Sequence, residues 1–336
     1  MQQTGVDGNE IEDLVLGCSF PEGEQGLNIA RLVALLVGLP QTVAGVTVNR
    51  FCGSSMQAIH QAAGAIQMNA GEAFICAGVE SMTRIPMGGF NPSPNPVLYK
   101  ELPAAYVSMG ITAENLAKKY SISREEQEAF AVLSHQKAAA AQAAGKLADE
   151  IVAVGKVDQD GCIRPETSAE TLSGLRLAFD ENGSVTAGTS SPLTDGASAT
   201  LVCSEDFARA HGLEVLARIR SVAVAGCAPE IMGIGPVNST RKALERAGLQ
   251  VSDMDIIELN EAFAAQSIPC VRDLDLDMDK VNLDGGAIAL GHPLGATGAR
   301  ITGKAASLLK REGKQFALAT QCIGGGQGIA TVLEAV

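Results

Sequence analysis

The sequence lacks several features that would assign it to a class at once. It has no run of about 18 consecutive apolar residues, so no membrane-spanning helix is expected. Positive charge is scarce, because 25 Lys and Arg stand against 38 Asp and Glu, which gives a net charge of −13. This balance argues against nucleic acid and anionic membranes as partners. An anionic ligand would therefore need a local basic patch.

No Cys or His pattern in the sequence has the spacing of a zinc site, so no metal is expected. Eight cysteines occur without a recognisable signal peptide. This combination favours reduced thiols and a cytoplasmic location. The 336 residues exceed what one ordinary core requires, so at least two domains are expected.

The order of predicted elements is that of an α/β protein. Strands and helices alternate up to residue 77 and again after residue 186. Between these parts, residues 86–103 contain five prolines, and residues 111–145 are helical, with Thr112, Ser121 and Ser123 as candidate caps. The predicted strands are 12–17, 42–49, 72–77, 200–203, 217–224, 255–260, 280–283, 315–321 and 328–333. The other predicted helices are 26–37, 53–69, 236–247, 261–271 and 295–311.

The order of elements also suggests a faint internal repeat. In the first copy a strand runs into Cys52, and a long helix and a second strand follow. In the second copy the strand at residues 280–283 precedes His292, and the next helix and strand end at Cys322. Two related halves would bring these strand ends to one interface, where α/β proteins bind ligands.

Four segments carry the candidate chemistry, namely residues 49–55, 260–264, 285–293 and 321–326. They supply the thiols of Cys52 and Cys322, the imidazole of His292 and the carboxamide of Asn260. Glycines in these segments let a substrate approach the backbone closely. Only four histidines are present, and a place between glycine-rich turns does not suit His292 as a packing residue. The other three histidines, His60, His135 and His211, are interpreted as surface or core residues.

Most cysteines in proteins are buried packing residues, and six of the eight are interpreted in that way. Cys52 differs because it opens a predicted helix, whose positive end lowers the pKa of a thiol. Cys322 differs because it stands between a buried strand and a glycine run. That run, residues 324–326, lacks the spacing of a dinucleotide or phosphate loop. The six structural cysteines are Cys18, Cys76, Cys162, Cys203, Cys227 and Cys270.

Together these groups support acyl transfer through a thioester. A thiol at a helix start beside a histidine is an activated nucleophile. A second thiol can shuttle a proton, and a carboxamide can hold a water. Backbone N–H groups at Cys52 and in the Gly324 turn can bind an oxyanion.

With these motifs, and with residues 108–115, 186–191 and 231–236, the chain resembles the thiolase family over essentially its whole length. Within the family it is most similar to the bacterial 3-ketoacyl-CoA branch of fatty-acid β-oxidation. The resemblance implies a thiolase fold, with two related α/β domains in layers and an inserted helical loop domain. It implies an N-terminal domain at 1–83 plus 193–214, a loop domain at 84–192 and a C-terminal domain at 215–336.

The resemblance also implies catalytic roles. Cys52 would attack the 3-keto carbon and become acylated. His292 would activate Cys52 and bind the enolate oxygen with a water held by Asn260. Cys322 would protonate the acetyl carbanion and deprotonate CoA, and the Gly324 N–H would complete a second oxyanion site. Arg164 matches a position near the CoA phosphates. The positions that match the pantetheine and acyl groove are Ser191, Ala187, Met109, Phe179, Met232 and Phe263.

The implied function is thiolysis of 3-ketoacyl-CoA, with CoA as co-substrate and no metal or other cofactor. The implied assembly is a homodimer that can join a hydratase/dehydrogenase subunit. Two alternatives stay open: the reverse condensation of two acetyl-CoA molecules, and a non-catalytic subunit that only assembles with a partner. Ser108 stands where short-chain biosynthetic relatives carry His, which favours the degradative branch.

Family members carry a further strand and helix before the segment that matches residues 11–17. The resemblance therefore predicts an unfilled central position in the N-terminal sheet. Unpaired backbone groups and apolar faces would be exposed there. Poor stability is expected as a result.

Overall fold

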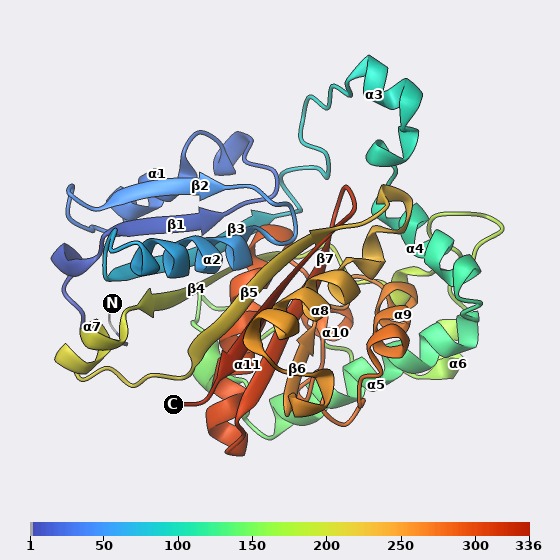
Figure 1. The fold of residues 1–336 in the computed structure, drawn as a ribbon. Coiled ribbons are helices and arrows are strands. Elements are labelled where there is room, and N and C mark those ends of the chain that lie inside the picture. The colour runs from blue at the N-terminus through green and yellow to red at the C-terminus, as the bar shows by residue number, and fades with distance from the viewer. Residues whose placement is uncertain (1–2) are drawn as a thin grey trace.

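A computed structural model describes residues 3–336, which form two four-stranded sheets with helices between and around them (Figure 1). The strands of the first sheet follow the order β2-β1-β3-β4, and those of the second follow β5-β8-β7-β6. The first sheet contains β1 (Asp13–Gly17), β2 (Ala44–Val48), β3 (Ala73–Ser81) and β4 (Asp195–Cys203). The second contains β5 (Arg218–Gly226), β6 (Ile256–Leu259), β7 (Phe316–Ile323) and β8 (Gln327–Glu334).

The two sheets share three strand pairings, as the internal repeat predicts, whereas the antiparallel pairing of β5 with β8 has no counterpart among the described strands of the first sheet. β1 pairs in parallel with β2 and β3, and β3 pairs antiparallel with β4. β6 pairs in parallel with β7, and β7 pairs antiparallel with β8. The counterpart of β2 is a single parallel bridge between Ile257 and Val281, so the strand predicted at 280–283 is reduced to one bridge. The parallel strands β1 and β6 thus end at equivalent places in the two halves.

Two helices form the layer between the sheets, α2 (Ser54–Gln67) and α11 (Thr297–Glu312). α2 packs on β1 and β3, α11 packs on β6 and β7, and the two helices contact each other. Their approach depends on Gly298, because a Cβ there would lie 2.3 Å from the backbone nitrogen of Met56. The buried side chains of Met56, Ile301 and Leu308 fill this contact. These are the long helices that the sequence predicted after Cys52 and His292.

The remaining helices cover the outer faces and form the insertion between β3 and β4. α1 (Ile29–Leu36) packs on β1 and β2, and α8 (Gly235–Ala247) packs on β5 and β8. The insertion contains α3 (Pro96–Glu101), α4 (Met109–Lys119), α5 (Arg124–Ala143) and α6 (Ala169–Ser173). Shorter pieces complete the fold, namely α7 (Glu205–Ala210), α9 (Ala264–Leu274), α10 (Ala287–Leu290) and several 3-10 turns.

Among the three candidate caps, only Ser123 is confirmed. Its side chain accepts a hydrogen bond from the Glu126 N–H (3.2 Å) at the start of α5. Thr112 lies inside α4, whose N-cap is Ser108, and Ser121 has a φ of +52° in the turn between α4 and α5. Both of these cap predictions are wrong, since α4 begins before Thr112 and α5 begins after Ser123 rather than after Ser121.

The predicted gap at the centre of the N-terminal sheet is wrong. Asp13–Gly17 pairs residue by residue with β2 on one side and with β3 on the other. The described strands therefore make a continuous sheet, with β2 and β4 at its edges. Within residues 3–336, no helix is long and apolar enough to cross a membrane.

Candidate active site

The structure brings the four motif segments together where the two halves meet. Cys52 stands in the turn before α2, Asn260 directly follows β6, and His292 follows α10. Cys322 lies near the end of β7, and Gly324 begins the turn into β8. The side chains are buried, with exposed fractions of 0% for Cys322, 1% for Asn260, 3% for His292 and 8% for Cys52.

The turn that carries Cys52 is fixed by hydrogen bonds from its neighbours. Phe51 has a φ of +43°, and its carbonyl accepts a bond from the Ser54 hydroxyl (2.6 Å). The Gln321 side-chain amide donates to the Cys52 carbonyl, which joins this turn to β7. The Gly324 N–H donates to the Cys52 sulfur. The sulfur thus already faces a backbone donor of the kind that can bind an oxyanion.

Both thiols are neutral at neutral pH, because the pKa of each is raised. Burial raises the pKa of Cys52 to about 12, and this effect outweighs the hydrogen bond from Gly324. Burial also raises the pKa of Cys322 well above the ordinary value, and the nearby Cys52 raises it further. The prediction that the helix end lowers the Cys52 pKa is wrong for this state, because loss of hydration is the larger effect.

His292 is held at its backbone and at its ring. Its N–H donates to Thr194 Oγ1 (3.1 Å), and its Nδ1 lies 2.7 Å from Thr297 Oγ1. Burial lowers the pKa of His292 to about 3, and the positive charge of Arg300 lowers it further. The imidazole is therefore neutral at neutral pH and can accept a proton from a thiol.

Asn260 lies beside His292. Its Nδ2 is 3.5 Å from His292 Nδ1 and 3.4 Å from Nε2, and its backbone N–H donates to the Thr320 carbonyl (3.0 Å). Asn260 Oδ1 is buried without a hydrogen-bond partner among the described residues. A buried acceptor of this kind suits a water or a polar substrate group.

Four of the residues predicted for the pantetheine and acyl groove gather beside the second thiol. Met232, Phe263 and Cys322 belong to one buried cluster, with Met109 packed against it. Phe179 makes an edge-to-face contact with Phe263, with ring centroids 5.8 Å apart. The apolar wall that the sequence predicted is therefore continuous with the thiol site.

The other predicted groove positions lie on the insertion. The Ser191 N–H donates to the Ala262 carbonyl (3.0 Å), which places Ser191 next to the Asn260 segment. Ala187 begins a 3-10 turn, Ala187–Thr189. Arg164 is exposed, and its backbone N–H donates to His135 Nδ1 (3.2 Å) on α5. No hydrogen bond or ion pair among residues 3–336 joins Arg164 to the other predicted site residues.

Sequence reasoning missed three residues that hold this site: Thr194, Thr297 and Gln321. Thr297 had a usable signal, because it is a polar residue at a helix start five positions after His292. Gln321 stands next to Cys322 and could have been named with it. Thr194 gave no signal, since it is far from His292 in the chain. In the part of the chain described, no group of three or more His, Cys, Asp or Glu side chains could hold a metal ion.

Comparisons with known proteins agree with this geometry. Residues 1–206 match the family model described as "Thiolase, N-terminal domain", and residues 213–335 match "Thiolase, C-terminal domain". A "3-ketoacyl-CoA thiolase" of Shewanella frigidimarina (strain NCIMB 400) is 55% identical over 98% of this chain and 89% of its own length. Proteins of the same name from Shewanella sp. (strain MR-7) and Shewanella denitrificans are each 56% identical, with the same coverage.

Proposed function

Since this chain belongs to the thiolase family, we propose that it cleaves 3-ketoacyl-CoA with CoA, giving acetyl-CoA and an acyl-CoA two carbons shorter. One observation carries the proposal: two buried thiols, Cys52 and Cys322, share a site with a neutral imidazole and a buried carboxamide. A single thiol would suffice for simple thioester exchange. A second acid–base thiol suits a reaction that also moves a proton at carbon.

The first half of the reaction forms the acyl-enzyme. His292 accepts the Cys52 proton as the sulfur attacks the 3-keto carbon. The N–H groups of Cys52 and Gly324 stabilise the resulting alkoxide. Collapse of the alkoxide breaks the bond between C2 and C3, and the electron pair passes to the enolate of acetyl-CoA. His292 and a water held by Asn260 bind the enolate oxygen, and Cys322 donates a proton to its carbon.

The second half transfers the acyl group to CoA. The Cys322 thiolate takes the proton from the CoA thiol, and the CoA sulfur attacks the acyl-Cys52 thioester. Cys52 leaves as a thiolate and recovers its proton from the His292 imidazolium. Each group thus returns to its starting state, and no redox partner or metal is required.

Substrate recognition follows from the apolar wall beside Cys322. We assign the acyl and pantetheine contacts to Met109, Phe179, Met232 and Phe263, and further contacts to Ser191 and Ala187 on the insertion. Arg164 is the basic residue for the CoA phosphates. A local positive charge is needed there because the whole chain has a net charge of −13. The exposure of Arg164 fits a contact with phosphates in solvent.

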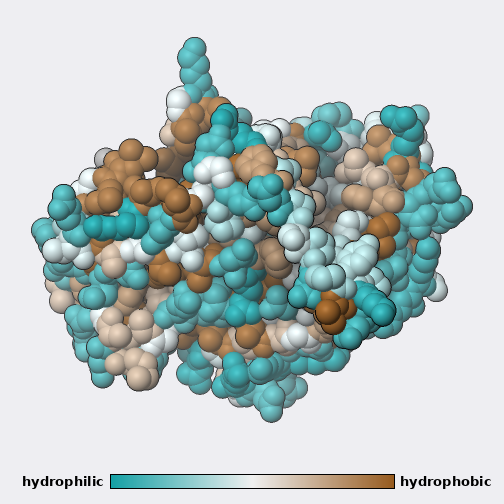
Figure 2. Space-filling view, turned by 90° about the horizontal axis from the view of Figure 1, so that it is seen from above, coloured by the Kyte–Doolittle hydropathy of each residue, from teal (hydrophilic) through white to brown (hydrophobic). Residues whose placement is uncertain are grey.

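The proposed assembly is a homodimer formed through the N-terminal sheet. β2 is an edge strand, and the adjacent helix α1 exposes Leu32, Leu35 and Leu36. Figure 2 shows brown, apolar residues gathered over the left part of its face, the side on which Figure 1 has α1 and β2. Assembly with a hydratase/dehydrogenase subunit and a cytoplasmic location complete the proposal. All eight cysteines are free, which fits a reducing compartment.

The test compares substrates in both directions. Purified protein is assayed for CoA-dependent loss of a long-chain 3-ketoacyl-CoA, for loss of acetoacetyl-CoA, and for condensation of acetyl-CoA. The proposal expects thiolysis of the long-chain substrate. Activity confined to acetoacetyl-CoA would replace it with the short-chain biosynthetic function. A cooperatively folded protein without any of these activities would establish the non-catalytic alternative.

A further inference from the structure

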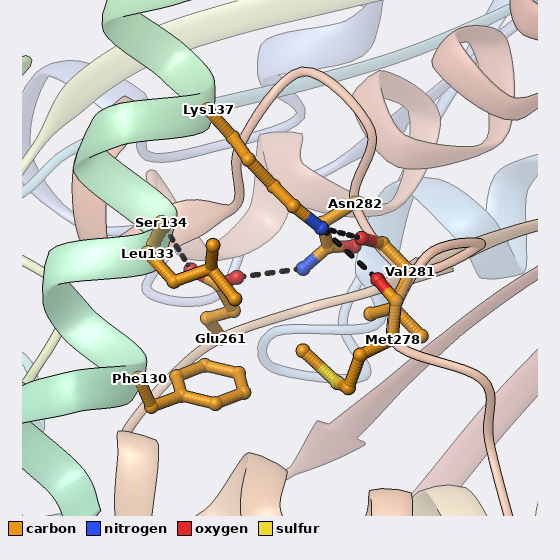
Figure 3. Close-up of a pocket in the computed structure, with 8 residues that line it drawn as sticks. All are labelled: Phe130, Leu133, Ser134, Lys137, Glu261, Met278, Val281 and Asn282. Atoms are coloured by element: carbon orange, nitrogen blue, oxygen red, sulfur yellow. Dashed lines mark hydrogen bonds between the residues drawn. The ribbon is translucent and has the colours of Figure 1, made fainter.

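Glu261, the residue after Asn260, is buried on the side of β6 that faces the insertion. Its carboxylate accepts hydrogen bonds from the Ser134 hydroxyl (2.6 Å), from Asn282 Nδ2 (2.7 Å) and from the Ile288 N–H (3.2 Å). Figure 3 shows the carboxylate between Ser134 on α5 and Asn282. One donor comes from α5, and the other two come from the segment between β6 and α11, so Glu261 connects two parts of the chain that are far apart in sequence.

Asn282 connects Glu261 to Leu259, the last residue of β6. Its Oδ1 accepts a bond from the Leu259 N–H (2.9 Å), and its Nδ2 donates to the Leu259 carbonyl (2.9 Å) as well as to Glu261. The side chain thus pairs with Leu259 as a neighbouring strand would. Leu259 is the residue before Asn260, so the backbone on both sides of Asn260 is fixed by one network.

The same network fixes the start of α10, which leads to His292. The N-cap of α10 is Gly286, which has no side chain to accept its free N–H groups. Glu261 accepts from Ile288, and Ser134 Oγ accepts from the Gly286 N–H (3.2 Å). A Cβ at Gly286 would lie 2.0 Å from Glu261 Cδ, so glycine is required for the carboxylate to reach this helix end.

The contacts around Glu261 also join α5 of the insertion to the C-terminal half. Lys137, one turn after Ser134 on α5, donates to the carbonyls of Met278 (3.1 Å) and Val281 (2.8 Å) (Figure 3). α5 therefore contacts the segment before Asn282 and, through Ser134, the segment after it. Burial raises the pKa of Glu261, and the hydrogen bonds from Ser134, Asn282 and Ile288 oppose this shift. Removal of the Glu261 acceptors leaves several buried donors unpaired.

We propose that Glu261 is a positioning residue that sets Asn260 against His292, through its contacts with Ser134, Asn282 and Ile288. The inference rests on the proposed function and extends it to a residue that does not touch the reacting atoms. His292 has supports of its own in Thr194 and Thr297. Asn260 has only long side-chain contacts with the imidazole, so its place depends on its backbone, which the Thr320 carbonyl and the Glu261 network hold.

Because Asn260 depends on the Glu261 contacts, whereas His292 has supports of its own, two reactions of the enzyme should respond differently when these contacts are lost. Cleavage of the C2–C3 bond forms an enolate and needs the Asn260 water. Exchange of labelled CoA into acetyl-CoA passes through acyl-Cys52 without forming an enolate, so it does not need Asn260. Loss of the Glu261 contacts is therefore expected to slow carbon–carbon cleavage much more than exchange. A residue that only stabilised the fold would lower both rates by the same factor.

The experiment measures both rates in Glu261→Gln, Ser134→Ala and the matched control Glu258→Gln. Glu258 lies on β6 and is buried like Glu261, but among the described residues it makes no hydrogen bond to residues 282–288. Glu261→Gln replaces an acceptor with a donor opposite Asn282. It is expected to slow cleavage of a 3-ketoacyl-CoA by roughly 10- to 100-fold, the cost of a misplaced group, and exchange by less than about 3-fold. Glu258→Gln is expected to leave the ratio of the two rates unchanged.

Ser134→Ala keeps the inference testable if Glu261→Gln does not fold. It removes one hydroxyl from α5, at a distance from the thiols, and is expected to reduce cleavage selectively by roughly 3- to 10-fold. Equal losses in both reactions, or unchanged rates in both Glu261→Gln and Ser134→Ala, would overturn the inference. Failure of the proposed function itself is distinct, because the parent protein would then show no cleavage.

Discussion

The Nδ1 atom of His292 lies 2.7 Å from the hydroxyl of Thr297, which is the first residue of α11. The helix that separates the two sheets thus also orients the imidazole of the site. A hydrogen bond at one ring nitrogen determines which tautomer is present and leaves the other nitrogen to exchange protons. The start of α11 therefore both packs between the two sheets and fixes the ring of His292.

Thr297→Val is expected to lower the turnover number in thiolysis by about 10-fold, with little change in KM. The valine keeps the shape of the side chain but removes the hydroxyl, which costs about 1–2 kcal/mol when a buried group is left unpaired. Steady-state kinetics with a 3-ketoacyl-CoA give both constants. Thr297→Ser is the control, since it keeps the hydroxyl and should stay close to the parent. Equal rates in the valine and serine variants would contradict the role of this bond.

Brief mixing with acetyl-CoA is expected to acetylate Cys52 alone. In the proposed mechanism Cys52 uses His292 as its base and two backbone N–H groups for the oxyanion, and its sulfur accepts a bond from the Gly324 N–H. Peptide mass spectrometry after acid quench locates the acetyl group among the eight cysteines. An adduct on Cys322 in place of Cys52 would reverse the roles assigned to the two thiols.

Cys322→Ala is expected to separate acyl capture from turnover. The variant should still acetylate Cys52 from acetyl-CoA, since the nucleophile and its oxyanion donors are intact. Thiolysis should fall by roughly 10²- to 10⁴-fold, the usual effect of losing an acid–base group. The two measurements are the acetylation assay above and the CoA-dependent loss of a 3-ketoacyl-CoA. Normal thiolysis in this variant would contradict the assignment of Cys322 as the group that transfers protons.

The four segments that the sequence predicted as the site converge in the structure, and their catalytic roles remain predictions. Cys52, Asn260, His292 and Cys322 each stand in a motif next to a predicted strand end or helix start, and strand ends of α/β sheets converge. Four of the positions that the resemblance assigned to the pantetheine and acyl groove pack together around Phe263, and their contact with a substrate remains a prediction. Arg164 was predicted in the same way, and its contact with CoA remains a prediction.

The predictions that were wrong share one physical cause, because each feature depends on how segments distant in the sequence pack together. The pKa of Cys52 is set by burial under β7 and its neighbours, which a local helix start cannot reveal. The order of strands is not the order of the sequence, so a sheet that seemed to have a central gap is continuous. The strand predicted at 280–283 stops at one bridge because Asn282 has a φ of +47° and pairs through its side chain. Thr194 reaches His292 only through the fold.

The buried histidine also predicts how stability depends on pH. The pKa of His292 is about 3 in the folded protein, and its ordinary value is 6.5. Below pH 6.5 the unfolded chain binds a proton that the folded chain excludes, so the free energy of unfolding falls as the pH drops from 6.5 toward 3. For one fully buried group the loss is about 1.4 kcal/mol per pH unit.

His292→Gln is expected to remove this contribution. Its free energy of unfolding should fall less than that of the parent protein between pH 7 and pH 5, by about 2 kcal/mol over that range. Urea unfolding followed by circular dichroism at several pH values gives the two curves. His60→Gln is the matched variant outside the site, because burial lowers the pKa of His60 to about 3 as well, and it should flatten the curve similarly. Parallel curves for the parent and His292→Gln would show that His292 titrates alike in the folded and unfolded protein, which would contradict the lowering of its pKa by burial.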